Sequence, residues 1–243
     1  MISLCEGRAI VCHPDRIMNG KKKEFVMDRD QARIAQAEVC KTAKKMYNSG
    51  LVAGTWGNIS ARIDDEYMAI TPSGMDYEGL SDEQMVIVNM NTLEYEGNLK
   101  PSIEAVVHAG IYKARPEVNG IMHTHSTNAL TVATARREIP PICEDQVQIL
   151  GGSVRCAEYA MPGTPEMAEA CIKALEGRNG ATIANHGAIT VDESLAKAFT
   201  GSMVLEKAAQ VFIDSQLLGG PVELTGEDVD TFTDFFRNKY GQR

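Results

Sequence analysis

The sequence predicts an α/β fold in which helices cover a central sheet, and three observations support this class. Short runs rich in β-branched residues alternate along the chain with longer segments of helical periodicity. Glycine, proline, serine and aspartate separate these runs, as is typical of turns. The length of 243 residues and the apolar content of 44% suit one large domain with a sizeable core. We therefore expect an α/β/α layered domain without an internal linker or repeat.

The first half of the chain is expected to begin with an extension and a long helix. Residues 1–27 lack clear periodicity and are predicted to be an N-terminal extension of a single domain that spans residues 1–243. In residues 28–49 apolar side chains recur at helical spacing, with Asp28 as N-cap and Gly50 as stop. Strands are then predicted at residues 58–63, 67–70 and 85–89.

The second half is expected to continue with mixed strands and helices. A helix over residues 102–113 is introduced by Pro101, capped by Ser102 and ended at Arg115-Pro116. The pattern then predicts a strand at 119–123, a helix at 126–135, an irregular stretch to Gly152, a helix at 165–175 capped by Thr164, one or two strands within 181–190, a helix at 194–218 and a last helix at 228–240.

Composition narrows the class of partner and the compartment. A net charge of −9, with no cationic cluster beyond Lys21-Lys22-Lys23, argues against nucleic acid as the main partner. No run reaches the roughly 18–20 apolar residues of a membrane span, and Glu6, Arg8 and Asp15 interrupt the place of a signal peptide. Six cysteines without framework spacing indicate free thiols in a reducing compartment. We expect a cytoplasmic protein with a small-molecule partner and no membrane partner.

Three histidines carry the strongest signal for chemistry. His123 and His125 stand at i and i+2 near a predicted strand end, so both side chains lie on one side and can bind one metal ion. His186 can complete an open three-ligand site from a second β-branched segment, where Gly187 lets the backbone approach closely. This pattern favours a catalytic divalent metal, above all Zn²⁺. The alternative is that the three are ordinary packed histidines.

The other two histidines have structural interpretations, and one carboxylate is a candidate for catalysis. His108 follows Glu104 by four residues on a predicted helix and shares its face, so it could orient Glu104 or simply pack, and packing is the expectation. His13 and Cys12 lack a standard zinc-site spacing. Glu104 lies in the first turn of its helix and is the carboxylate we expect to transfer a proton, the alternative being a solvated first-turn glutamate.

Three turns together describe a phosphate-binding cradle. Residues 54–60 hold two glycines, an amide and two hydroxyls just before a predicted strand, and residues 71–74 form a second Gly/Ser turn. Ser102 adds a hydroxyl at a predicted helix N-terminus, which favours negative charge. Each turn alone is weak, because most such turns are only turns.

Five ordered motifs, at residues 57–60, 71–74, 100–104, 123–125 and 185–187, resemble the class II aldolase/adducin family over roughly residues 28–240. The resemblance implies an α/β/α fold around a mostly antiparallel sheet. It also implies a homotetramer with active sites at subunit interfaces and one Zn²⁺ in each, with Mn²⁺ or Co²⁺ as alternatives.

Roles for individual residues follow from the same resemblance. The metal ligands match His123, His125 and His186, and the acid/base carboxylate matches Glu104. The phosphate-binding positions match Asn58, Ser73, Gly74 and Ser102, with Thr55 and Gly57 beside them. Ile103 departs from the family members that act on L-fuculose 1-phosphate, which have a second serine there. Glu144 and Asp145 stand where those enzymes place a tyrosine in the neighbouring subunit's site, so the second proton carrier is expected to be a carboxylate.

The function implied is metal-dependent cleavage of a ketose 1-phosphate to dihydroxyacetone phosphate and an aldehyde. The expected substrates are L-fuculose 1-phosphate and a 5-deoxy or methylthio pentulose 1-phosphate. Within the family, L-ribulose-5-phosphate 4-epimerase, which has Asp at the position of Glu104, and methylthioribulose-1-phosphate dehydratase are alternatives. A non-catalytic, adducin-like interaction module is the alternative from another class, and the presence of all three histidines and Glu104 argues against it.

Overall fold

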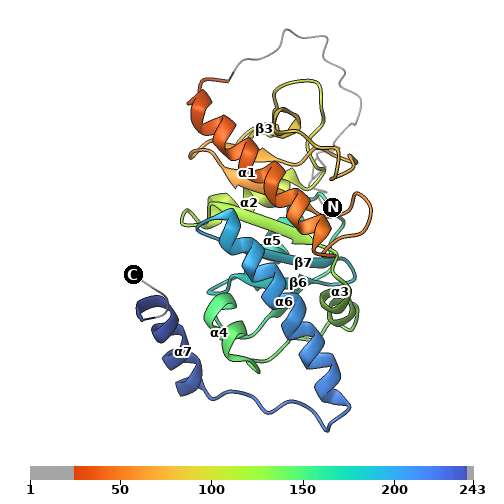
Figure 1. The fold of residues 1–243 in the computed structure, drawn as a ribbon, viewed down its shortest axis with the longest axis vertical. Helices are drawn as coiled ribbons and strands as arrows, with labels where there is room; N and C mark the ends of the chain where they lie inside the picture. Colours follow the sequence, from red (N-terminus) through yellow and green to blue (C-terminus); the bar gives the residue numbers. More distant parts are fainter. Residues whose placement is uncertain (1–24, 240–243) are drawn as a thin grey trace, which may run out of the picture.

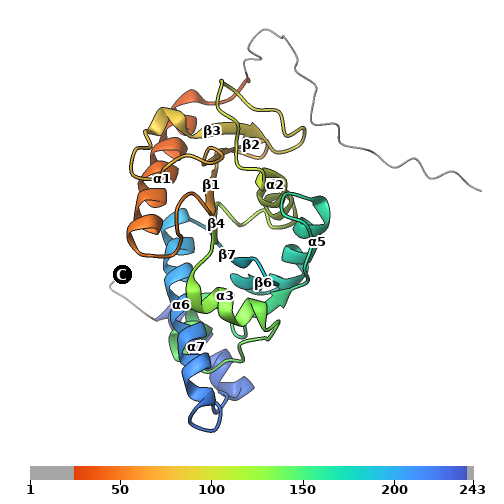
Figure 2. The same ribbon diagram turned by 90° about the vertical axis from the view of Figure 1, so that its right-hand side faces the viewer.

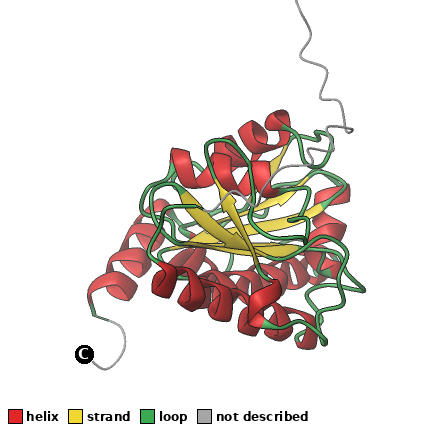
Figure 3. Ribbon diagram, turned by 90° about the horizontal axis from the view of Figure 1, so that it is seen from above, coloured by secondary structure: helices red, strands yellow, loops and turns green. Residues whose placement is uncertain are grey.

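A computed structural model describes residues 25–239, so nearly all of the predicted N-terminal extension lies outside the described residues. One sheet of seven strands runs through the molecule in the order β3-β2-β1-β4-β7-β6-β5. Every neighbouring pair is antiparallel except β5 and β6. Helices lie on both faces of this sheet (Figure 3). The α/β/α fold around a mostly antiparallel sheet is therefore confirmed.

The elements follow one another in a mixed order along the chain (Figure 1). The helices are α1 (Arg29–Asn48), α2 (Ala105–Ala114), α3 (Thr127–Thr134), α4 (Glu144–Leu150), α5 (Pro165–Ala174), α6 (Leu195–Gln216) and α7 (Gly226–Asn238), with a short 3₁₀ helix η1 (Asp82–Gln84). The strands are β1 (Asn58–Arg62), β2 (Tyr67–Ile70), β3 (Val86–Asn89), β4 (Gly120–Thr124), β5 (Arg155–Ala157), β6 (Gly180–Ile183) and β7 (Gly187–Asp192). None of the helices within residues 25–239 combines the length and apolarity that crossing a bilayer requires.

The sheet separates two helical layers, which Figure 2 shows on either side of the strands. Helices α2 and α5 pack together on one face, and α1 and α6 cover the other. Successive residues of the central strand β4 serve the two layers, since Ile121 joins the cluster under α2 and Met122 joins the cluster under α1. His123 consequently points to the same side as Ile121, toward the N-terminus of α2.

Most predicted elements occur within a few residues of their expected bounds, and their caps explain why. Asp28 accepts hydrogen bonds from two backbone N–H groups at the start of α1, Thr164 caps α5, and Thr225 caps α7. Two predictions were wrong. Helix α2 begins at Ala105, with Glu104 rather than Ser102 as its N-cap. The stretch to Gly152 predicted to be irregular contains α4, which has seven residues and no side-chain cap, too weak a signal to detect.

An ion pair fastens the beginning of α1 to the segment after β3. Arg29 Nη1 lies 2.7 Å from Glu96 Oε2, and the Phe25 N–H donates to Glu96 Oε1 at 2.6 Å. Burial acts to raise the pKa of Glu96, but the hydrogen bonds from Arg29 and Phe25 outweigh it and lower the pKa below its usual value. The folded state therefore favours the ionised carboxylate.

Glu96→Gln is expected to lower the free energy of unfolding at neutral pH by about 1–2 kcal/mol, because a charged hydrogen-bond acceptor is lost. A group whose pKa is lowered on folding stabilises above its unfolded pKa of about 4.3, and this contribution disappears as the pH falls through the folded pKa. Urea unfolding at neutral and acidic pH measures the difference from wild type. Glu78→Gln, at an exposed carboxylate, is the control, and an identical pH dependence for both variants would contradict this account.

Candidate active site

The three predicted histidines converge on one point at the end of the central strands. His123 belongs to β4, His125 follows that strand, and His186 lies in the turn between β6 and β7. Their ring centroids are 4.7, 4.8 and 5.0 Å apart, and one nitrogen from each ring lies within 4.8 Å of the others. Among the described residues, this is the group of histidine, cysteine or carboxylate side chains arranged to hold a metal ion.

The turn that carries His186 has a backbone that only a few residue types favour. Asn185 has a φ of 57°, in the left-handed region that asparagine tolerates, and the His186 N–H donates to Ile183 O at 2.9 Å. The Arg136 guanidinium donates to Asn185 Oδ1 at 3.0 and 3.1 Å and holds the turn from outside. A Cβ at Gly187 would meet the Thr124 carbonyl oxygen, so only glycine lets this hairpin approach β4.

Hydrogen bonding and burial keep the three imidazoles neutral. The Nδ1 atom of His123 lies 3.0 Å from Ala188 O, and because a carbonyl only accepts, Nδ1 carries the proton and Nε2 presents a lone pair. Burial lowers the pKa of His123 to about 4. Burial, with the neighbouring imidazoles, lowers the pKa of His125 to about 3 and that of His186 to about 4. Neutral imidazole is the form that binds a metal.

The donor set fits a catalytic zinc-type site. Three imidazole nitrogens with room for a further ligand form the arrangement typical of catalytic Zn²⁺. The Nδ1 atom of His186 is buried and has no partner among the described residues, whereas the Nε2 atoms of His123 and His125 approach to 2.9 Å. A cation between the three rings could accept the lone pairs of these closely spaced nitrogens and so remove their mutual repulsion.

Glu104 lies at the same point and is almost fully buried. Its Oε1 is 3.3 Å from His186 Nε2, and its Oε2 is 3.4 Å from His123 Nε2. Asn58 Nδ2 donates to Oε2 at 3.0 Å. The Glu104 side chain does not cap its own helix, so the carboxylate is turned toward the histidines rather than toward α2. It is placed to exchange a proton with a molecule bound beside them.

The donor turns are joined side by side next to the histidines. The Ser73 N–H donates to Lys100 O at 2.9 Å and the Ser102 N–H donates to Thr71 O at 3.0 Å. These backbone N–H groups are consequently occupied. Ser102 Oγ accepts from the Glu104 N–H at 3.3 Å and keeps its own O–H as a donor, and both serines line the same cavity. Asn58 uses one amide N–H for Glu104 and keeps the other.

One cavity of about 460 Å³ contains nearly all of the predicted site. The six predicted phosphate-binding residues line it together with Glu104 and the three histidines: Thr55, Gly57, Asn58, Ser73, Gly74 and Ser102. The apolar part of the lining, which comes from Trp56, Pro72 and Pro162, was not predicted from the sequence. Ile103, which stands where some family members have a serine, lies in the same lining. No lysine or arginine is among the lining residues.

Glu144 and Asp145 lie apart from this cavity at the start of α4. Asp145 Oδ2 accepts from Lys207 Nζ at 2.6 Å, and Glu144 is exposed. Within a single chain the structure does not bring them to the histidines. Their predicted role was in the site of a neighbouring subunit, so it stays a prediction.

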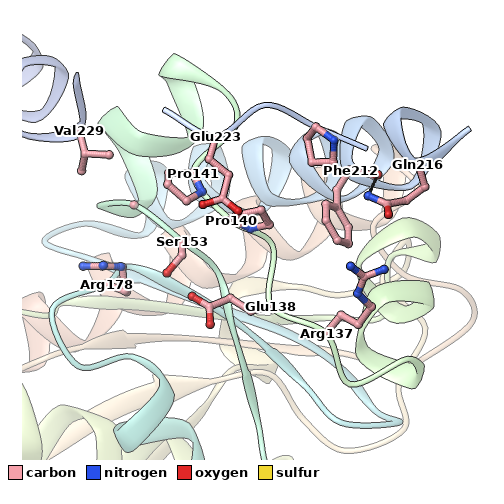
Figure 4. Close-up of a pocket in the computed structure, with 12 residues that line it drawn as sticks. Arg137, Glu138, Pro140, Pro141, Ser153, Arg178, Phe212, Gln216, Glu223 and Val229 are labelled. Carbon is pink, nitrogen blue, oxygen red and sulfur yellow. Dashed lines mark hydrogen bonds between the residues drawn. The ribbon is translucent and has the colours of Figure 1, made fainter. Parts of the chain in front are cut away.

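A second cavity, of about 550 Å³, lies between the segment before α4 and the end of α6 (Figure 4). Arg137 and Arg178 line it together with Glu138 and Glu223, and its lining includes three prolines and Phe212. The Arg137 guanidinium lies 5.0 Å from the Phe212 ring. Its lining holds charged side chains of both signs but no histidine or cysteine, so this cavity shows no chemistry comparable to that of the histidine site.

Comparison with known proteins shows a consistent likeness. Residues 37–213 match the family model of the class II aldolase and adducin N-terminal domain. The chain is 34% identical over 207 residues to 5-deoxy-D-ribulose 1-phosphate aldolase of Bacillus thuringiensis, covering 85% of this chain and 96% of that protein. It is 33% identical over 207 residues to L-fuculose phosphate aldolase of Escherichia coli, covering 85% and 95%. A solved structure of L-fuculose 1-phosphate aldolase, 33% identical, superposes with a TM-score of 0.80 over 84% of this chain and 96% of that one.

Gly187→Ala is expected to weaken metal binding by about 10- to 100-fold, because the added methyl pushes the hairpin and His186 away from β4. Titration of the purified protein with Zn²⁺ against a competing chelator measures this affinity. Gly79→Ala is the matched control, since a methyl there meets open space and the backbone is not strained. Equal affinities for the two variants would show that the close approach of the hairpin does not position the ligand.

Proposed function

Because the chain belongs to the class II aldolase and adducin family and is a sugar-phosphate aldolase, we propose that it uses a divalent metal, Zn²⁺, to cleave a ketose 1-phosphate into dihydroxyacetone phosphate and an aldehyde. One observation carries this proposal. Three neutral imidazoles and a buried carboxylate converge in a single cavity that Ser73 and Ser102 also line. Mn²⁺ and Co²⁺ suit the same donors.

The proposed chemistry assigns each residue a step. A metal held by His123, His125 and His186 would supply Lewis-acid chemistry, which stabilises the negative charge that develops as the ketose is cleaved. The C3–C4 bond breaks with its electron pair left on C3, the C4 hydroxyl passes its proton to Glu144 or Asp145 of a neighbouring subunit, and the aldehyde leaves. Glu104, in its protonated form, then delivers its proton to C3, which completes dihydroxyacetone phosphate, and proton exchange with solvent restores both carboxyl groups. Asn58 holds the Glu104 carboxylate in place through its 3.0 Å hydrogen bond.

The proposed substrates are L-fuculose 1-phosphate and a 5-deoxy or methylthio pentulose 1-phosphate. Their phosphate would lie against Ser73, Gly74 and Ser102, where the hydroxyls supply neutral donors. All of these substrates release an aldehyde that ends in a methyl group. Trp56 and Ile103, which line the cavity, are 64% and 68% exposed and offer apolar contact to such an end.

We further propose a homotetramer with each site at a subunit interface. Beyond Trp56 and Ile103, Tyr159 and Met161 are large apolar side chains that remain 54% and 65% exposed on the segment leading to Pro162 at the cavity. A neighbouring copy would bury this surface. In that arrangement Glu144 or Asp145 of the neighbour supplies the group that takes the C4 hydroxyl proton.

We assign the enzyme to the cytoplasm. Cys40, Cys143, Cys156 and Cys171 are free thiols, which suits a reducing compartment. Burial, with the Glu104 charge as a second cause, raises the pKa of Cys171 to about 12, so this thiol is held unreactive.

Glu104→Gln is expected to retain bound metal and to abolish exchange of the C3 proton of dihydroxyacetone phosphate with solvent. The amide preserves the size of the side chain but cannot accept the proton. Proton NMR of dihydroxyacetone phosphate in D₂O with the metal-loaded variant measures the exchange. Retained exchange would remove Glu104 from this role.

The interface role of Glu144 and Asp145 predicts complementation between inactive variants. Glu104→Gln and Glu144→Gln proteins, dissociated and reassembled together, should recover up to about a quarter of wild-type activity, since random mixing places two intact residues at that share of interfaces. Asp145→Asn is tested in the same way. No recovery from mixed tetramers verified by native mass spectrometry would place the second proton carrier elsewhere.

A further inference from the structure

Three polar side chains form a buried hydrogen-bonded network directly behind Glu104. Ser60 of β1 and His108 of α2 are 0% exposed, and Tyr112 of α2 is 1% exposed. His108 Nδ1 lies 2.6 Å from Ser60 Oγ, which lies 2.9 Å from the Tyr112 hydroxyl. The Tyr112 hydroxyl also donates to Ser60 O at 3.0 Å. His108 therefore packs, as the sequence predicted, but it packs as part of a polar network.

The network includes a second hydrogen bond between β1 and α2, parallel to the one that Asn58 makes to Glu104. Ser60 stands two residues beyond Asn58 and on the same face of β1, and His108 stands four residues beyond Glu104 on the same face of α2. The pair Ser60–His108 is consequently the next connection between strand and helix after the pair Asn58–Glu104. One connection borders the metal site, and the other lies one step deeper in the core.

The hydrogen bonds have a defined direction. Burial lowers the pKa of His108 to about 3, so the ring is neutral and carries one proton. With that proton on Nδ1, His108 donates to Ser60 Oγ, Ser60 donates to the Tyr112 oxygen, and Tyr112 donates to Ser60 O. Every donor then has an acceptor, and only the lone pair of His108 Nε2 lacks a partner among the described residues.

This network fixes α2 against β1 more narrowly than apolar packing would. Hydrogen bonds constrain both distance and angle, whereas apolar contacts of similar area tolerate sliding. The Arg62 guanidinium adds to the constraint, because it donates to Tyr112 O at 2.8 Å and lies 4.6 Å from the Tyr112 ring. Glu104 depends on this placement, since Asn58 is the one hydrogen-bond donor to its carboxylate among the described residues.

We propose that Ser60, His108 and Tyr112 are positioning residues, which set the place of the Glu104 carboxylate by fixing the start of α2 against β1. The inference rests on the proposed function, in which Glu104 transfers a proton at C3. None of the three lines the cavity, so their effect on catalysis would pass through Glu104.

The test compares steady-state kinetics, dihydroxyacetone phosphate proton exchange and metal content of Ser60→Ala with wild type. We expect kcat and the exchange rate to fall by about 10- to 100-fold, the loss that a displacement of about 1 Å causes, while KM and metal content change by less than about twofold. His108→Leu should behave alike. His108→Asn, which keeps an N–H close to the Nδ1 position, should recover most of the rate.

Ser202→Ala is the matched control. Ser202 Oγ lies 2.6 Å from Thr190 Oγ1 in an equally buried pair, but α6 covers the opposite face of the sheet from α2. Both variants should lose similar stability, and only Ser60→Ala should lose kcat. Tyr112→Phe provides a smaller deletion if Ser60→Ala does not fold.

The outcomes separate the inference from the function on which it rests. Equal kcat for Ser60→Ala and Ser202→Ala at equal folded fraction, in an active wild type, would overturn the positioning role. A loss of kcat in His108→Leu that His108→Asn does not recover would show that the hydrogen bond from His108 to Ser60 does not carry the effect, and would also overturn the positioning role. A metal-loaded wild type without cleavage or proton exchange would instead reject the proposed function.

Discussion

The antiparallel pairing of β4 with β1 on one side and β7 on the other is the constraint on which the site depends. It sets Asn58 opposite His123 and brings the hairpin that carries His186 beside the same strand. Because strand registers are fixed by a buried sheet, His123 is held within the sheet, and His125 and His186 lie directly beside its strand ends. Gly187 is the residue that allows the hairpin carrying His186 to approach β4.

The electrostatics of the cavity follow from burial. Three imidazoles are kept neutral, one carboxylate lies among them, and the lining contains no lysine or arginine. Such a cavity has no fixed positive charge with which to hold a sugar phosphate, so a bound cation would complete both the ligand set and the charge balance. Behind Glu104, the buried network of Ser60, His108 and Tyr112 joins α2 to β1, and Asn58 of the same strand joins β1 to the carboxylate itself.

The sequence predicted those features that depend on spacing along the chain. The i, i+2 histidines, the caps at Asp28 and Thr164 and most strands could be predicted because each depends on nearby residues. Contacts between segments that are distant in the chain could not be predicted from the sequence. Nothing in the local sequence indicates that the Ala188 carbonyl orients His123, or that Arg136 holds the turn at Asn185. Short elements such as α4 and β5 were missed because their periodicity covers too few residues.

The most direct test of the central claim is dihydroxyacetone phosphate release by metal-depleted and Zn²⁺-reconstituted protein, followed by a coupled assay. The substrates are L-fuculose 1-phosphate, 5-deoxyribulose 1-phosphate, methylthioribulose 1-phosphate and L-ribulose 5-phosphate. Our account predicts release from at least one 1-phosphate, lost on metal removal and restored by Zn²⁺. No release of dihydroxyacetone phosphate from any 1-phosphate, despite bound metal, would contradict this account and favour the epimerase or dehydratase chemistry of the family. Failure to bind metal at all would favour an interaction module.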